Sequence, residues 1–177
     1  MWNSFSISRF PFTGTIALTA FVSLVTALDQ VTKYVVISRL PEGAYVRVIP
    51  GFFRIVHFRN SGAAWGILQG YTGLLSLFSV VVCVVLIVWF RSFADGFWER
   101  TIALGLLLAG IIGNLIDRIL RQEVIDFLLV FFRGFRWPAF NVADCAICVG
   151  VGIYIASSLF RREDFSEQHA ERRGQSS

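Results

Sequence analysis

The feature that most constrains this chain is the length of its uncharged stretches. Among 177 residues, no Asp, Glu, Lys or Arg occurs in residues 10–28, 60–90, 101–116, 137–143 or 145–160. A helix needs about 20 apolar residues to cross a bilayer, and these stretches lack the alternation of a membrane β-strand. We therefore predict an all-α membrane protein with four transmembrane helices, at about residues 12–35, 70–90, 100–120 and 138–160.

Composition agrees with this class. The chain is 55% hydrophobic and 16% charged, whereas a soluble domain carries about 25% charged residues. The net charge of +4 comes mostly from loops and tails, so no nucleic-acid partner is indicated. We interpret residues 1–177 as one membrane domain, with 161–177 as a solvated, frayed polar tail. A cleavable signal peptide is the alternative for the first span, but its apolar part exceeds the usual length of about 7–15 residues.

The first predicted loop has a strand pattern of its own. Residues 43–58 alternate apolar and basic side chains around Pro50-Gly51, which predicts a short hairpin or small sheet at about residues 43–59. A run of small residues that includes Gly62 follows Asn60. Small residues allow close backbone approach, so this run indicates either tight helix packing or contact with a ligand.

Polar residues collect on one side of the predicted membrane domain. Four crossings place both termini on one side, and the first and third loops on the other. The polar side chains near that other side are Asp29, Asn60, Asn114, Asp117, Asp126, Asn141 and Asp144. Ionisable residues inside a membrane are costly and mark function by default. Seven Lys and Arg residues fall on the terminal side and nine on the other, so charge does not orient the chain.

Helical spacing groups these residues further. Gly110, Asn114 and Asp117 are at i, i+4 and i+7 on the third span, and Asn141 and Asp144 are at i and i+3 on the fourth. Each set therefore shares one helix face. Two close carboxylates cannot both ionise, so one holds a proton while the other acts as a base. Such a pair can hydrolyse a peptide bond with water.

Two questions stay open at this point. The carboxylates could serve only to hold helices together by pairing with Arg118 or Arg121, which lies one turn after Asp117. Spacing alone also leaves open whether Asp117 or Asp126 is the partner of Asp144.

Other chemistries are less well supported. The histidines are His57 in a loop and His169 in the tail, so we expect no metal site and no cofactor. No histidine lies in a span to activate a serine or cysteine nucleophile. Cys145 and Cys148 have C-x-x-C spacing, but on a membrane helix we interpret them as small apolar filler.

Two rival classes remain, a small transporter or proton-coupled channel and a structural membrane scaffold. A proton relay needs sites across the full membrane thickness, which one-sided clustering does not provide. A scaffold would not require Asp126 and Asp144 together.

Five short blocks in order, at residues 29–33, 60–66, 113–118, 124–127 and 140–144, resemble bacterial lipoprotein signal peptidases (signal peptidase II). The resemblance covers about residues 29–150. It implies a multi-pass inner-membrane aspartic endopeptidase with cytoplasmic termini and a site toward the periplasmic face. It also implies that the hairpin is the extracytoplasmic β-cradle of that family.

The implied substrates are prolipoproteins that carry diacylglycerol, cut just before the lipidated cysteine. The implied partners are these substrates and membrane lipid, and we expect a monomer. The implied catalytic pair is Asp126 and Asp144. The implied substrate-binding or supporting residues are Asp29, Asn60, Gly62, Asn114, Asp117, Arg118, Asn141 and Ala143.

Overall fold

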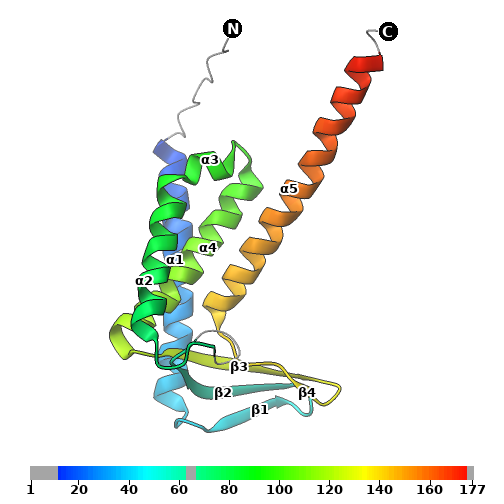
Figure 1. Ribbon diagram of the computed structural model, residues 1–177. Helices are drawn as coiled ribbons and strands as arrows, with labels where there is room; N and C mark the ends of the chain where they lie inside the picture. The colour runs from blue at the N-terminus through cyan, green and yellow to red at the C-terminus, as the bar shows by residue number, and fades with distance from the viewer. Residues whose placement is uncertain (1–11, 63–66, 175–177) are drawn as a thin grey trace.

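The computed structural model describes residues 12–62 and 67–174. In chain order the elements are α1 (Phe12–Arg39), β1 (Tyr45–Ile49), β2 (Phe53–Asn60), α2 (Thr72–Val88), α3 (Phe90–Ala94), α4 (Trp98–Arg121), β3 (Val124–Phe132), β4 (Phe135–Arg136) and α5 (Val142–Gly174). Figure 1 shows the long helices side by side and the strands across one end of them. The beginning of α1 and the end of α5 lie toward the opposite end.

Three helical segments within the described chain are long and apolar enough to cross a membrane: Gly14–Arg39, Trp98–Arg121 and Val142–Phe160. They confirm a multi-pass membrane protein. α2 is also apolar, but its 17 residues put it at the lower limit for a crossing. The fourth span therefore stays a prediction. Beyond the third of these segments, α5 continues as helix to Gly174, through most of the tail that we expected to be frayed.

The small sheet is larger than the first loop alone predicts. The hairpin expected around Pro50-Gly51 is present as β1 and β2, and Gly51 has the positive φ of +75° that its turn requires. β3 and β4 join it in the antiparallel order β1-β2-β3-β4. Asp126 is therefore on a strand rather than in a loop. The reason is the sequence of β3, which is almost entirely aliphatic and aromatic and pairs with β2 on one side.

A tight reversal brings α4 and β3 together. α4 ends at Arg121. The next residue, Gln122, has a left-handed backbone (φ 63°) that closes the last turn, and β3 begins two residues later at Val124. The last turns of α4, with Asp117, are consequently beside the beginning of β3, with Asp126.

Burial is inverted relative to a soluble protein. Large apolar side chains such as Leu24 and Phe78 are exposed on the helix surfaces, as expected for contact with lipid. Among the most deeply buried side chains are instead Asp29, Lys33 and Asp117, each at most 1% exposed. The centre of the molecule near the sheet is a polar core, and its interactions define the candidate site.

Glycines allow the helices to approach one another at this core. A Cβ atom on Gly113 would lie 2.7 Å from Oδ2 of Asp29 on α1, and one on Gly110 would collide with the backbone oxygen of Ala143 on α5. The face predicted for Gly110, Asn114 and Asp117 is thus the face of α4 that packs against α5 and α1.

Candidate active site

A cavity of about 740 Å³ lies between the sheet, α4 and the beginning of α5. Its polar lining includes Asn60, Asn114, Arg118, Asp126 and Asp144. Its apolar lining includes Phe58, Trp137, Pro138, Phe140 and Ile147. Both candidate catalytic carboxylates therefore face the same cavity. Its lining is mostly apolar with a few polar groups, as is common in ligand-binding sites.

Asp126 is positioned by strand pairing and by two amides. It is opposite Phe58 in the pairing of β3 with β2, and its side chain is 4% exposed. Asn60 Nδ2 donates to Oδ2 at 3.0 Å, and Asn141 Nδ2 donates to Oδ1 at 2.8 Å. Each carboxyl oxygen of Asp126 thus has one neutral donor.

Asp144 is positioned by the beginning of a helix. Asn141 precedes α5, and its Oδ1 accepts a hydrogen bond from the Asp144 backbone N–H at 3.0 Å. In return, Asp144 Oδ2 accepts from the Asn141 backbone N–H at 3.1 Å. This reciprocal arrangement is a capping box with Asp at the third helical position. The helix N-terminus also stabilises negative charge on Asp144.

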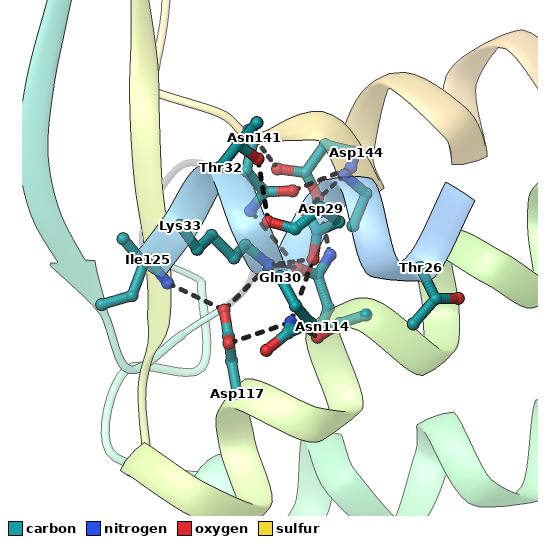
Figure 2. A network of polar contacts seen from close by, with 12 residues as sticks. Thr26, Asp29, Gln30, Thr32, Lys33, Asn114, Asp117, Ile125, Asn141 and Asp144 are labelled. Carbon is teal, nitrogen blue, oxygen red and sulfur yellow. Dashed lines mark hydrogen bonds and ion pairs between the residues drawn. The ribbon is translucent and has the colours of Figure 1, made fainter. Parts of the chain in front are cut away.

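Asn114 connects the site to the polar core. Its Nδ2 donates to Asp144 Oδ1 at 2.9 Å, and its Oδ1 accepts from Asn141 Nδ2 at 3.2 Å and from Lys33 Nζ at 3.1 Å. Figure 2 shows these contacts converging from α1, α4 and the beginning of α5. Lys33 therefore acts on Asp144 through one asparagine.

The other two carboxylates of the polar core, Asp29 and Asp117, form ion pairs with basic side chains. Lys33 Nζ lies 2.8 Å from Oδ2 of Asp29 and 2.8 Å from Oδ2 of Asp117, and Arg121 pairs with Oδ1 of Asp117. Gln30 Nε2 donates to both carboxylates, at 3.1 and 3.3 Å. Neither Asp29 nor Asp117 lines the cavity. The pairing of Asp117 with Arg121 confirms the helix-spacing expectation, and it gives Asp117 a structural partner.

The neutralised carboxylates hold the backbone beside the candidate pair. Asp29 Oδ1 accepts from the backbone N–H of Ala143 at 2.9 Å, immediately before Asp144. Asp117 Oδ2 accepts from the backbone N–H of Ile125 at 3.2 Å, immediately before Asp126. Lys33 thus connects two carboxylates that each fix one of the elements carrying a candidate catalytic residue.

The environment of Asp126 favours the protonated form of its carboxyl group. Burial raises the pKa of its carboxyl group to about 7, and the negative charge of Asp144 acts in the same direction. The hydrogen bonds from Asn60 and Asn141 oppose that rise. Near neutral pH this carboxyl group can therefore keep a proton beside a second carboxylate, which is the state a general acid and base pair needs.

Arg118 and Gly62 complete the polar side of the cavity. Arg118 Nη2 donates to the Gly62 backbone oxygen at 3.5 Å, and both residues line the space. Arg118 Nε is buried and has no hydrogen-bond partner in the described part of the chain. A Cβ atom on Gly62 would lie 2.7 Å from the Ile67 backbone oxygen, so this position requires close packing. The rest of that predicted small-residue block, residues 63–66, lies outside the described residues.

Sequence reasoning missed Lys33 and Arg136. Lys33 was part of a recognised block but had no expected role, although its i, i+4 spacing from Asp29 could have indicated an ion pair. Arg136 lines the cavity, with its guanidinium carbon 5.4 Å from the centre of the Phe58 ring. Cys145 and Cys148, interpreted as filler, line it too. Among the described residues, no three His, Cys, Asp or Glu side chains are grouped as metal ligands would be.

Comparison with known proteins identifies the family. The sequence pattern of the family described as Signal peptidase (SPase) II matches residues 21–160. The lipoprotein signal peptidases of Listeria monocytogenes serotype 4a and Listeria innocua serovar 6a are each 44% identical over 127 residues, which are 72% of this chain and 82% of theirs. The chain belongs to the signal peptidase II family. The resemblance read from the five sequence blocks is thereby confirmed, and the protein is a membrane peptidase.

Solved structures agree with this family. Two bacterial membrane enzymes have similar folds, with TM-scores of 0.80 and 0.75 and sequence identities of 35% and 36%. The first similarity covers 86% of this chain and 92% of the solved chain, and the second covers 84% and 94%. The arrangement of helices and small sheet is therefore that of a known type of bacterial membrane enzyme.

Proposed function

We propose that this signal peptidase II is an intramembrane aspartic endopeptidase. In this proposal it removes the signal peptide from diacylglyceryl-modified prolipoproteins by cutting just before the lipidated cysteine. Family membership and the relatives named lipoprotein signal peptidase support the substrate class. The aspartic mechanism rests on the geometry of the cavity.

One observation carries the mechanism: four acidic side chains of the polar core, Asp29, Asp117, Asp126 and Asp144, divide into two kinds. Asp29 and Asp117 are paired with Lys33 and Arg121 and are absent from the cavity lining. Asp126 and Asp144 line the cavity, and among the described residues neither forms an ion pair. This division favours Asp126 rather than Asp117 as the partner of Asp144.

The two carboxyl groups take different roles. Asp144 lies in the first turn of α5 and receives hydrogen bonds from Asn114 Nδ2 and the Asn141 backbone N–H, both of which stabilise a carboxylate. Asp126, with its pKa raised to about 7, keeps its proton. Asp144 is thus the base that takes a proton from the attacking water. Asp126 is the acid that donates its proton to the scissile carbonyl oxygen as the tetrahedral intermediate forms. When the intermediate collapses, the proton held by Asp144 passes to the leaving nitrogen, and the proton on the intermediate's oxygen returns to Asp126.

The cavity lining suits a lipid-anchored peptide. Arg118 lines the cavity, where its guanidinium group can donate to a substrate backbone carbonyl, while Phe140 and Ile147 offer apolar contact. A diacylglyceryl group favours lipid by about 0.8 kcal/mol for each buried CH₂. It would therefore hold the scissile bond at a fixed height, near the end of the helices where Asp144 lies.

We also propose an orientation of the protein in the membrane. With α2 as a fourth span, both chain ends face the cytoplasm, and the sheet and cavity face the periplasmic side of the inner membrane. The beginning of α1 and the end of α5 both lie away from the sheet, toward the opposite end of the molecule, in agreement with this arrangement (Figure 1). We propose that one copy of the chain is sufficient, because both carboxylates come from the same chain.

The proposal is tested with two peptides that differ only in the diacylglyceryl group on the cysteine. Purified enzyme is incubated with each peptide in the same detergent, and the products are identified by mass spectrometry. We expect one cut, before the lipidated cysteine, and a much lower rate on the unlipidated peptide, since a displacement of about 1 Å can cost about 10²-fold. Equal rates on both peptides would remove lipid anchoring from the proposal. A cut at another bond would overturn the proposed specificity.

A further inference from the structure

Two arginines lie opposite each other near one edge of the sheet. Arg47 on β1 and Arg54 on β2 are direct cross-strand partners, so their side chains leave the same face. Their guanidinium carbons lie 6.0 and 4.9 Å from the centre of the same ring, that of Tyr45. The Arg54 carbon also lies 4.6 Å from the centre of the Phe131 ring. Two positive charges are thus held together by aromatic stacking, although like charges directly opposite each other destabilise a sheet.

Among the side chains that the structure describes, no carboxylate forms an ion pair with Arg47 or Arg54. The nearby Arg59 on β2 differs, because it lies 2.9 Å from a Glu42 oxygen and 3.7 Å from a Glu123 oxygen. The acidic side chains close to the sheet are therefore committed elsewhere. Arg47 and Arg54 are left as a pair of fixed cations with donors available to an external anion.

The position of the pair relative to the helices limits what that anion can be. α1 has 28 residues, or about 42 Å at about 1.5 Å per residue, which exceeds the hydrocarbon thickness of about 30 Å. Its end at Arg39 consequently reaches the headgroup region, and β1 begins six residues later. Val46, Ile49 and Phe52 beside the pair are each about half exposed. Apolar and aromatic side chains mixed with arginines are typical of a membrane–water interface.

We propose that Arg47 and Arg54 together bind the phosphate of an anionic phospholipid headgroup. The planar guanidinium group donates two parallel hydrogen bonds to phosphate oxygens, and two such groups on one face can share one phosphate. A zwitterionic headgroup would bring its own ammonium group close to two cations. The site therefore favours a headgroup with a phosphate and no ammonium, as in phosphatidylglycerol. This binding does not depend on the proteolytic mechanism.

The proposal is tested by lipid retention rather than by activity. Full-length protein in detergent is mixed with equal amounts of phosphatidylglycerol and phosphatidylcholine, and bound lipids are counted by native mass spectrometry. We expect the wild type to prefer phosphatidylglycerol by about tenfold, which corresponds to about 1.4 kcal/mol. Arg47→Gln with Arg54→Gln should reduce that preference to near equality. Arg47→Lys with Arg54→Lys, which keeps the charge but loses the planar fork, should keep only part of it.

The matched control is Arg39→Gln with Arg133→Gln, which removes two positive charges from the same end of the molecule. It should keep the wild-type preference, because neither residue is opposite another arginine in the described strand pairs. An equal loss in the control would show a general charge effect and overturn the site. No preference in the wild type would also overturn it. Loss of the preference in an excess of inorganic phosphate would show a general anion site rather than a lipid site.

Discussion

Asn141 and Asp144 satisfy each other's backbone at the beginning of α5, with Oδ1 of Asn141 3.0 Å from the Asp144 nitrogen and Oδ2 of Asp144 3.1 Å from the Asn141 nitrogen. The same asparagine donates to Asp126 from Nδ2. One residue therefore begins the helix that carries one candidate catalytic group and also contacts the other. Helix capping and the geometry of the pair are physically coupled.

Two substitutions of Asn141 distinguish its capping of α5 from its hydrogen bond to Asp126. Asn141→Ala removes both the cap acceptor and the Nδ2 donor, and it should lower stability by about 1 kcal/mol. Asn141→Ser keeps a cap acceptor but lacks the donor to Asp126, so it should stay close to wild-type stability. Both variants should lose about 10²-fold in turnover, because the carboxyl groups are no longer held together. Thermal unfolding and turnover of a lipidated peptide are the measurements, and a fully active serine variant would contradict the role of Nδ2.

Lys33 should be needed for stability as well as for activity. Lys33→Met leaves Asp29 and Asp117 buried without their shared cation, and breaking a buried pair costs about 3–5 kcal/mol. The elements that carry Asp126 and Asp144 lose their fixed supports at the same time. We expect a clear fall in the unfolding temperature in detergent, accompanied by loss of turnover.

A double variant distinguishes unpaired charge from lost packing. Lys33→Met with Asp29→Asn should unfold at a higher temperature than Lys33→Met alone, because it removes the Asp29 carboxylate, which has lost its cation, while Asp117 keeps its pairing with Arg121. Asp29→Asn alone serves as the reference for the cycle. If Lys33→Met unfolds at the wild-type temperature, the buried ion cluster has no supporting role.

The pH dependence of kcat/KM should report the proton on Asp126. Its pKa is raised to about 7, so the acid is lost as the pH rises through that value and activity should fall on the alkaline side. The hydrogen bond from Asn60 lowers this pKa. Asn60→Ala should therefore move the alkaline limb to higher pH.

Gln69→Ala is the matched control for that shift, since Gln69 lines the same cavity and forms no described hydrogen bond to either carboxyl group. Its alkaline limb should coincide with that of the wild type. A shift of the Asn60→Ala limb to lower pH would contradict the assignment of the proton.

The two cavity cysteines give a steric test. Cys148 is exposed and Cys145 half-buried, and both line the cavity. A bulky maleimide should lower wild-type turnover by blocking the space, whereas Cys145→Ser with Cys148→Ser should be active and resistant to the reagent. Substrate present during labelling should protect the wild type. If the double variant is inactive without any reagent, the interpretation of these residues as filler is wrong.

Periodicity and spacing predicted the features that depend on local sequence. The long uncharged stretches predicted the helices, and the i, i+4, i+7 spacing placed Gly110, Asn114 and Asp117 on one packed face. The alternation around Pro50-Gly51 predicted the β1–β2 hairpin. Each of these signals lies within one element or two consecutive ones, so no knowledge of tertiary structure was needed.

The features that were missed depend on contacts between distant segments. The segment around Asp126 is apolar on nearly every residue, so it has no alternation, and its pairing with β2 and β4 makes it a strand. Lys33 reaches Asp117 and Asn114 across 84 and 81 positions of the chain, respectively. Without those contacts, spacing could not show which carboxylates are neutralised and which face the cavity.

The central claim is that Asp126 and Asp144 form the catalytic pair, and the most direct test is turnover of a lipidated peptide by purified Asp126→Asn and Asp144→Asn. Each variant should insert and unfold like the wild type but lose at least about 10²-fold in turnover, because an amide cannot act as a general acid or base. Asp95→Asn, which changes an exposed carboxylate paired with Arg100 at the beginning of α4, the opposite end of that helix from Asn114 and Arg118, should keep wild-type turnover. If either folded variant keeps more than about a tenth of wild-type turnover, the account of the catalytic pair is contradicted.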